Sequence, residues 1–168
     1  MSAGSATVAT RPATPSDLPA LGRLGALLVR LHHTFDAARF IVAMPRLEER
    51  YASFLGDELA KPDVVVLVAE QDGVVLGYAY GAVEGPDYMA LRGPAGVCHD
   101  LVVDPAHRGR GVGRSLLDAM LSALLARGAP RVVLMTAEQN AAAQRLFERV
   151  GFRRTMIEMT RELHRDAS

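Results

Sequence analysis

The sequence predicts an α/β domain, of α+β mixed character, built on a mixed and mostly antiparallel sheet flanked by helices. Valine-rich runs at 64–69 and 74–82 are typical of strands. Apolar residues spaced three and four apart over 18–31, and again over 112–124, are typical of helices that bury one face. A strand–helix–strand pattern over 97–136 follows the valine-rich pair. Strands and helices mixed in this order favour one layered domain.

The N-terminal third is predicted to be mainly helical. Residues 1–10 are small and polar and are expected to form a flexible segment, and a first strand is expected over 11–14. A helix signal at Ser16 precedes the leucine pattern that runs to Leu31. Pro45, whose fixed φ suits a first helical turn, marks the start of a second helix, which Pro62 ends.

The middle of the chain is predicted to form a hairpin and a third strand. Asp72-Gly73 separates the two valine-rich runs and has the composition of a two-residue hairpin turn. Glycines and prolines between 84 and 96 predict a loop. The strand after that loop is expected over 97–103, up to Asp104-Pro105.

Alternating helices and strands complete the prediction. A helix over 111–127 carries apolar residues at four-residue steps that would pack on the sheet, and Gly128 can cap its end. A short buried strand over 131–136, a helix over 140–150 and a last strand over 152–161 are expected to follow.

Length and composition predict one cytoplasmic domain over residues 11–168. Of the 168 residues, 49% are hydrophobic, which is enough for one substantial core. Nineteen basic residues balance nineteen acidic ones, so no net field favours nucleic acid or an anionic membrane. The lone Cys98 cannot form an internal disulfide, and neither a signal-peptide core nor a long apolar run is found. We therefore expect no nucleic-acid and no membrane partner.

The most informative segment is the turn between the strand at 97–103 and the helix after it. Gly109, Gly111 and Gly113 remove Cβ atoms where the backbone must bend, and free amides at a helix start are ready partners for phosphate. Three arginines add positive charge there, namely Arg108, Arg110 and Arg114. The turn lacks the lysine of a phosphate loop and the spacing of a dinucleotide turn. It predicts a pyrophosphate site, with a glycine-capped helix and solvated arginines as the alternative.

Two linked motifs resemble the GNAT superfamily of N-acetyltransferases. Its acetyl-CoA signature, Gln/Arg-x-x-Gly-x-Gly/Ala after a strand ending in Val-x-Pro, is matched by Arg108, Gly111 and Gly113 after Val103-Asp104-Pro105. Its second pattern, an asparagine, an alanine-rich helix and then Leu-Tyr-x-x-x-Gly-Phe, is matched over 140–152 with Phe147 at the tyrosine. The resemblance covers nearly the whole chain. It implies the GNAT acyl-CoA N-acyltransferase fold and transfer of an acetyl group from acetyl-CoA to an amine.

The same resemblance implies where acetyl-CoA would bind. The main chain of Leu101, Val102 and Val103 would hold the pantetheine arm like an added strand, and a β-bulge would turn one amide toward the thioester carbonyl. Asn140 would hydrogen-bond the cofactor, a role compatible with capping its helix, and Phe147 would lie beside it. The pyrophosphate would lie on the main chain beside Arg108, at Gly109, Arg110, Gly111, Val112, Gly113 and Arg114.

Acetyl transfer also needs a group that accepts a proton from the amine. The departing thiolate needs a proton as well, unless it leaves unaided. The family usually supplies this acid as the tyrosine that Phe147 replaces, and a phenyl ring cannot donate a proton. A water or another residue could serve, and the remaining candidates in the front half are Tyr78, Tyr80 and Tyr88. Coenzyme A thiolate is itself a tolerable leaving group.

His99 is the candidate base, because an imidazole titrates near neutrality and this one precedes the cofactor-holding strand. The run 98–103 is similar to a Glu-Asp-containing strand of polyamine acetyltransferases, with His99 at the glutamate. A half-buried structural histidine is the alternative. Asp100 is adjacent and is therefore expected to face the opposite side of the pleat, and Glu138 is a lesser candidate.

The acceptor is expected near the connection between the first two helices. His32, His33 and Asp36 are candidate substrate contacts, with surface histidines as the alternative, and no metal is expected because no third ligand is spaced with them. Tyr51 and Phe54 are expected to lie in the core.

The predicted reaction is direct attack of a small-molecule or peptide amine on acetyl-CoA within a ternary complex. No covalent enzyme intermediate is expected, since Cys98 lies in an apolar strand that favours a buried, inert thiol. A second hypothesis is a catalytically weak or inactive module that binds acyl-CoA and regulates a partner. The identity of the acceptor and a homodimeric state are left open by the sequence, because acceptor choice lies in variable loops.

Overall fold

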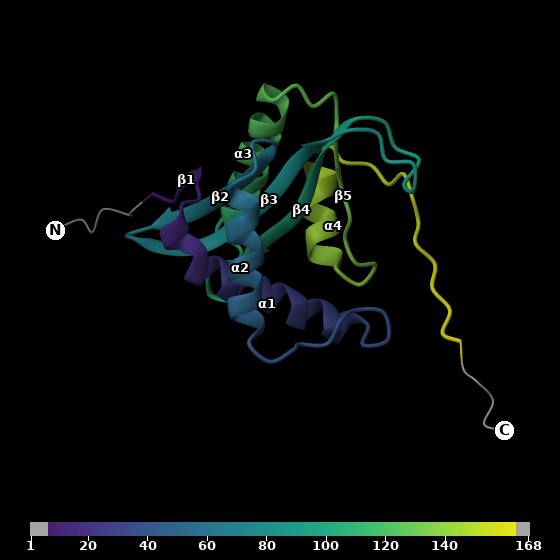
Figure 1. Cartoon of the computed structure of the whole chain (residues 1–168), viewed down its shortest axis with the longest axis horizontal. Helices are drawn as coiled ribbons and strands as arrows, with labels where there is room; N and C mark the ends of the chain where they lie inside the picture. The colour runs from purple at the N-terminus through teal and green to yellow at the C-terminus, as the bar shows by residue number, and fades with distance from the viewer. Residues whose placement is uncertain (1–6, 164–168) are drawn as a thin grey trace.

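The computed structural model describes residues 7–163 and contains a five-stranded sheet with helices against it (Figure 1). The strands lie side by side in chain order: β1 (Ala9–Pro12), β2 (Val64–Gln71), β3 (Val74–Glu84), β4 (Ala95–Val103) and β5 (Val132–Leu134). β1 to β4 pair antiparallel, and β5 pairs with β4 in parallel. The predicted mixed, mostly antiparallel sheet is confirmed.

Four α-helices accompany the sheet in the described part of the chain. They are α1 (Leu18–Phe35), α2 (Leu47–Leu59), α3 (Val112–Ala126) and α4 (Ala141–Arg149), with 3-10 turns at Pro15–Asp17 and Pro105–His107. None of these helices is both long and apolar enough to cross a membrane.

Two hydrophobic cores occupy the two faces of the sheet, because successive side chains of a strand point to opposite faces. Val65 and Leu67 of β2 pack with Leu116 and Met120 of α3 on one face. The neighbouring β2 residues Val66 and Val68 pack on the other face, with Leu21 and Leu24 of α1, Leu55 of α2 and Tyr78 of β3. The valine-rich runs are buried on both faces, which is why they lack a polar alternation.

Local sequence signals placed most elements within a few residues. The predicted turn at Asp72-Gly73 is confirmed, with positive φ values of 53° and 78° that match a tight hairpin. β1 begins at Ala9, so the end of the segment expected to be flexible over 1–10 is a strand, while residues 1–6 lie outside the described residues. β5 is shorter than its predicted run. The second helix begins at Leu47 rather than near Pro45, because Arg46 adopts a left-handed conformation (φ 58°) that a helix cannot include.

The strand predicted over 152–161 is wrong for the single chain. Residues 152–163 carry no regular structure, and beyond Phe152 they are exposed. A strand requires a hydrogen-bonding neighbour, and the described chain places none beside this segment. Figure 1 shows it leaving the body of the molecule after α4.

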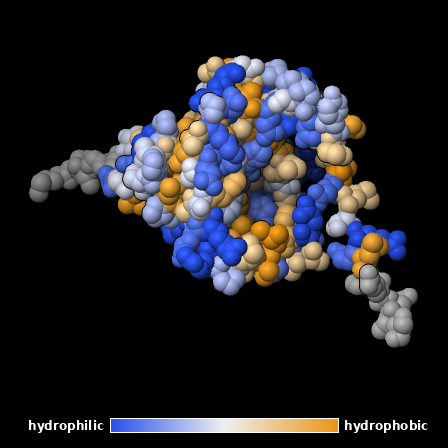
Figure 2. Space-filling model, viewed as in Figure 1, coloured by the Kyte–Doolittle hydropathy of each residue, from blue (hydrophilic) through white to orange (hydrophobic). Residues whose placement is uncertain are grey.

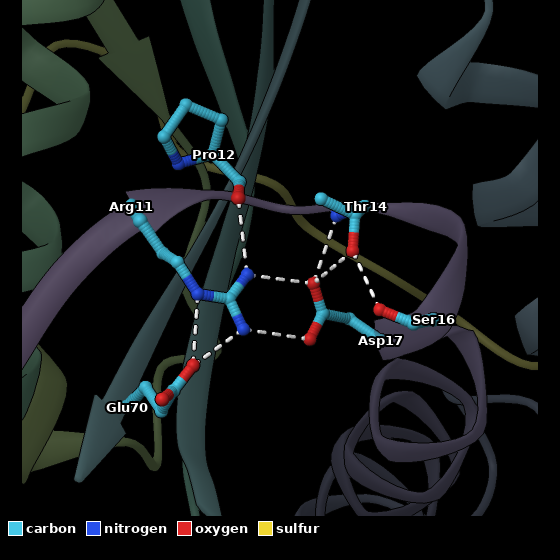
Figure 3. Close-up of polar contacts among 6 residues, drawn as sticks. All are labelled: Arg11, Pro12, Thr14, Ser16, Asp17 and Glu70. Carbon is cyan, nitrogen blue, oxygen red and sulfur yellow. Dashed lines mark hydrogen bonds and ion pairs between the residues drawn. The ribbon is translucent and has the colours of Figure 1, made fainter. Parts of the chain in front are cut away.

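An ion-pair cluster fastens β1 to the start of α1 and to β2 (Figure 3). The Arg11 guanidinium donates from Nη1 to Oδ2 of Asp17 at 2.8 Å and from Nε to Oε2 of Glu70 at 2.8 Å. The hydrogen bonds from Arg11 lower the pKa of the buried Asp17 to about 2, from an ordinary value of 3.8. Because the folded-state pKa is depressed, this carboxylate stabilises the fold above pH 3.8 and loses that contribution as pH falls through 2.

Candidate active site

β4 and β5, the last two strands of the sheet, diverge beyond Cys98 and Leu134. Their pairing covers Gly96–Val132 to Cys98–Leu134, whereas β4 remains paired with β3 as far as Val103. On the side that faces β5, residues 101–103 therefore have no strand beside them in the described chain. An extended ligand can form main-chain hydrogen bonds along such an edge. This is the edge that the resemblance assigned to pantetheine.

The glycine-rich turn connects that edge to α3 in a conformation that requires glycine. Gly109 and Gly111 have φ values of 73° and 80°, in the left-handed region that side chains disfavour. Gly111 is the N-cap of α3 and has no side chain that could accept a hydrogen bond from the first amides of the helix. The amide of Ser115 bonds the carbonyl of Gly111, so the amides of 112–114 precede the first helical bond. The turn thus presents backbone donors at the positive end of the α3 dipole.

The turn, the end of β4 and α4 meet around Gly113. A Cβ at Gly113 would lie 3.5 Å from Val103 Cγ2 and 3.5 Å from Leu146 Cδ2, whereas Cβ atoms at Gly109 and Gly111 would have nothing within 4 Å. The backbone at 109 and 111 is therefore open to a ligand. The side chains of Val102 and Val112 are buried in the two cores, so only their main chain could contact a ligand.

The three arginines of the turn are exposed and each has a partner on its own chain. Arg108 Nε donates to the carbonyl of Val103 at 3.1 Å, Arg110 Nη2 donates to Gln71 Oε1 at 3.0 Å, and Arg114 Nε donates to Asp118 Oδ2 at 2.7 Å. Their charge surrounds the free amides and would favour an anion there.

A β-bulge places His99 beside the open edge. Tyr80 pairs with Asp100 and Gly81 pairs with Cys98, so His99 is the extra residue of β4. The expectation that Asp100 faces away from His99 is wrong, because the bulge breaks the alternation. His99 stacks on the Tyr80 ring at 5.0 Å between centroids, and Asp100 bonds Tyr78, two residues earlier on the same face of β3.

A carboxylate that sequence reasoning missed holds the imidazole. Nε2 of His99 lies 2.8 Å from Oε1 of Glu84, and Nη2 of Arg92 donates to Oε2 of Glu84 at 2.8 Å. A neutral imidazole that donates from Nε2 to this carboxylate keeps Nδ1 as a proton acceptor. Glu84 ends β3 and pairs with Ala95 at the start of β4, so only the antiparallel register brings it near His99.

Asp100 is buried and accepts two tyrosine hydroxyl groups. Tyr51 of α2 donates to its Oδ2 at 2.7 Å and Tyr78 of β3 at 2.8 Å. Burial raises the pKa of Asp100, against the opposing effect of both hydroxyls. Burial and the nearby Asp100 charge also raise the pKa of Tyr51 and Tyr78. Tyr51, expected in the core, is thus partly buried and joins a polar network.

The candidate acids have other partners or lie in solvent. The hydroxyl of Tyr78 is engaged by Asp100, and that of Tyr80 donates to Glu58 Oε2 at 3.0 Å. Tyr88 is 88% exposed in the loop between β3 and β4. Phe147 is buried and meets Phe152 edge to face at 5.9 Å.

A cavity of about 270 Å³ brings several predicted residues together. His99, Asp100 and Leu101 line it from β4, and Asn140 and Phe147 line it from the start and body of α4. The Asn140 side chain also accepts from the amide of Ala143 at 3.3 Å, so the predicted helix cap is confirmed. Figure 2 shows the molecule hollowed on the viewed face, with hydrophobic residues gathered below the hollow.

The end of α1 and its connection to α2 also line the cavity. Leu28, Val29 and His32 lie in α1, so His32 is part of that helix rather than of the connection, and Phe40 and Ile41 lie in the connection. His33 and Asp36 instead make local bonds, to the Phe40 carbonyl and to the amides of Ala38 and Arg39. Phe54, expected in the core, is 43% exposed.

The described residues contain no group of three ligating side chains that could hold a metal ion.

Glu138, the lesser candidate base, is exposed and is not among the residues that line the cavity. Cys98 is buried, and burial followed by the Asp100 charge raises the pKa of its thiol to about 12. A thiol of this kind stays protonated, as expected of an inert cysteine.

Sequence comparisons agree with this geometry. The model of the acetyltransferase (GNAT) family matches residues 28–152. A mycothiol acetyltransferase of Thermobispora bispora is 38% identical over 96 residues, which are 55% of this chain and 31% of that protein. An L-methionine sulfoximine/L-methionine sulfone acetyltransferase of Salmonella typhimurium is 37% identical over 91 residues, 52% of this chain and 49% of that protein. The chain therefore spans about a third to a half of the length of these relatives.

Solved structures share the fold over nearly the whole chain. A mutant of the BH1408 protein of Bacillus halodurans has a TM-score of 0.80 at 21% identity, over 93% of this chain and 99% of that one. An aminoglycoside N-acetyltransferase, AAC(6')-Iy in complex with CoA, has a TM-score of 0.77 at 19% identity, over 97% of this chain and 99% of that one. With its diverging strands, bulged β4 and glycine-rich turn, this chain belongs to the acetyltransferase (GNAT) family.

Proposed function

We propose that the protein is an acetyl-CoA-dependent N-acetyltransferase. Acetyl-CoA, when bound, supplies the acetyl group as a thioester. The open edge of Leu101, Val102 and Val103 suits pantetheine, and the uncapped amides after Gly111 suit pyrophosphate. Both lead toward the cavity that His99, Asn140 and Phe147 share. A cofactor held along this path would bring its thioester to the bulge.

The observation that carries the proposal is the position of His99 at the bulge, inside the cavity and bonded to Glu84. In the proposed reaction the amine nitrogen attacks the thioester carbonyl carbon, and Nδ1 of His99 takes the amine proton directly or through a water. The carbon–sulfur bond then breaks, and the thiolate leaves with its electron pair. The bulge would also turn a backbone amide toward the carbonyl oxygen, where negative charge develops.

Departure of the thiolate needs no protein acid in this proposal. Phe147 offers no proton, and the Tyr78 and Tyr80 hydroxyls are engaged by carboxylates. A coenzyme A thiolate is stable enough to leave and to take its proton from water. Phe147 would then serve as an apolar wall beside the acyl group.

The acceptor is proposed to be a primary amine of a small molecule or peptide. The names of the relatives and structural neighbours, which include mycothiol and aminoglycoside acetyltransferases, support a small-molecule acceptor. Residues 11–168 would act as a single domain in the cytoplasm, as a homodimer. The lone buried thiol and balanced charge support this location.

Phe147 also suits a second hypothesis, in which the chain binds acyl-CoA without turnover and regulates a partner. The bonded His99–Glu84 pair weighs against it, because a module that only binds needs no oriented base.

Release of free thiol from acetyl-CoA tests the proposal and separates the two hypotheses. Incubation of the protein with acetyl-CoA and a panel of aminoglycosides, amino acids, small amines and peptide N-termini is expected to release thiol with at least one amine. The amount of thiol released should equal the amount of acetylated amine formed. Tight binding of acetyl-CoA without product from any amine would favour the regulatory module.

A further inference from the structure

Among the described residues that line the cavity, Asp100 has the only carboxylate. Its Oδ2 accepts the hydroxyl groups of Tyr51 and Tyr78, whereas its Oδ1 accepts no hydrogen bond from a described residue. Every fully enclosed polar side-chain atom in the described part of the chain has a partner, so Oδ1 must keep some contact with open space. The carboxylate therefore offers one oxygen to a ligand in the cavity.

No cation of the described chain compensates this carboxylate. Its two partners are neutral hydroxyl groups, and no described Lys or Arg forms an ion pair with it. Burial raises the pKa of Asp100, because the charged form is poorly solvated where it lies. An ammonium group at Oδ1 would supply the opposite charge that a buried carboxylate needs. The oxygen thus suits a cationic group of the acceptor.

The other polar side chains of the cavity do not favour an anionic group on the acceptor. None of the described residues that line the cavity is Lys or Arg. His32 donates from Nδ1 to the carbonyl of Leu28 at 2.9 Å, so the neutral ring keeps only Nε2, which is an acceptor. A carboxylate or phosphate next to the amine would find no positive partner there.

The end of α1 and its connection to α2 give the cavity an apolar wall. Leu28 and Val29 line it from α1, and Phe40 and Ile41 line it from the connection. Ile41 is 64% exposed, so this wall continues to the surface. Figure 2 shows hydrophobic residues gathered below the hollow, where Figure 1 places the connection. A second charge on the acceptor would lose its hydration against these side chains and gain no partner.

The volume of the cavity limits the size of the acceptor. At about 270 Å³ it is smaller than the roughly 300–1,000 Å³ of pockets that enclose drug-sized ligands. The acetyl thioester would take part of this space. What remains suits one ring or a short alkyl chain.

We infer that the acceptor is an alkyl- or arylalkylamine with one positive charge, whose ammonium group binds Oδ1 of Asp100 and whose apolar body packs on Leu28 and Ile41. This inference names the acceptor class of the proposed function and rests on it. The bound ammonium releases one proton to water before the neutral nitrogen attacks, and the transfer then proceeds as proposed above. A diamine, an aminoglycoside or an amino acid would bring a further charge for which the cavity has no partner.

Matched amines test the acceptor class one feature at a time. Hexamethylenediamine adds a second charge to hexylamine, and phenylalanine adds a carboxylate to phenethylamine. We expect kcat/KM, corrected for the neutral fraction of each amine, to be at least about tenfold higher for hexylamine and phenethylamine than for their charged analogues. Phenylalaninamide, which has a neutral group in place of the carboxylate, should recover part of the loss. A smaller preference, or the reverse order, would overturn the acceptor class and leave the proposed function intact.

Ile41→Asp is expected to reverse the preference between the two alkylamines. Ile41 is exposed and lines the cavity, so the variant should fold and should carry a carboxylate on the apolar wall. Hexylamine should lose about tenfold in kcat/KM, and hexamethylenediamine should gain. Val42→Asp is the matched control, since Val42 is 61% exposed and does not line the cavity, and its preference should remain that of the wild type. Equal preferences in the two variants would contradict the apolar wall.

Binding of hexylamine to the complex with coenzyme A separates this inference from the proposed function. Calorimetric titration needs no turnover and should detect binding, with an affinity that Asp100→Asn lowers by about tenfold or more. The asparagine keeps the size of the side chain and one oxygen for the two hydroxyl groups. Binding without turnover of any amine would reject the proposed function and leave the ammonium site intact. Absence of binding, or an unchanged affinity in Asp100→Asn, would overturn the ammonium site.

Discussion

Replacement of His99 by alanine is expected to lower kcat/KM at pH 7 by about 10²- to 10⁴-fold, the usual contribution of a general base. The imidazole faces the cavity, and its bond to Glu84 keeps one ring nitrogen free for the amine proton. Part of the loss should be recovered as pH rises, because a larger share of the amine is then already neutral. Steady-state rates between about pH 6 and 10 with any accepted amine measure both effects.

Phe147→Tyr is the matched control for this variant. It restores the family's usual acid at another position that lines the same cavity, and turnover should be unchanged or improved if the thiolate leaves unaided. His99 could instead have only a structural role. In that case His99→Ala would lower the free energy of unfolding and leave the pH profile of the folded enzyme unshifted, which would falsify its assignment as the base.

Gly111→Glu is expected to abolish acetyl-CoA binding in a folded protein. At φ 80° a side chain strains the backbone by about 1–2 kcal/mol, but no atom lies within 4 Å of the added Cβ, so the chain should still fold. The new carboxylate would lie beside the amides proposed for the pyrophosphate and would repel it. Calorimetric titration should detect no binding at concentrations that saturate the wild-type protein.

Gly128→Glu separates strain from charge. Gly128 has a φ of 85° and follows the C-terminal end of α3, and a Cβ added there would also have nothing within 4 Å. Its substitution should reduce stability by a similar amount and leave acetyl-CoA affinity unchanged. If Gly111→Glu and Gly128→Glu bound acetyl-CoA with equal affinity, the glycine-rich turn would not be part of the cofactor site.

Features set by short-range chemistry could be read from the sequence. The hairpin at Asp72-Gly73 and the turn at Gly109 and Gly111 all require positive φ, which leaves a local signal. The cap at Asn140 is equally local. The GNAT motifs lie in these same segments, so the family and the cofactor path could be predicted with them.

Features set by pairing between distant segments could not be predicted from the sequence. The resemblance implied a bulge in this strand, but its position at His99 depends on which residues of β3 face Cys98 and Asp100, and neither strand alone reveals that pairing. Tyr51 and Asp100 are 49 positions apart, and Glu84 reaches His99 only through the register of β3 and β4. The segment 152–161 has the composition of a strand, but a strand also needs a neighbour that its own chain does not place beside it.

A crystal structure of the protein with coenzyme A tests the central claim most directly. The account predicts the pyrophosphate on the amides of 109–114, the pantetheine along Leu101 to Val103, and the sulfur in the cavity between His99 and Phe147. Coenzyme A bound elsewhere, or with its sulfur outside that cavity, would contradict it.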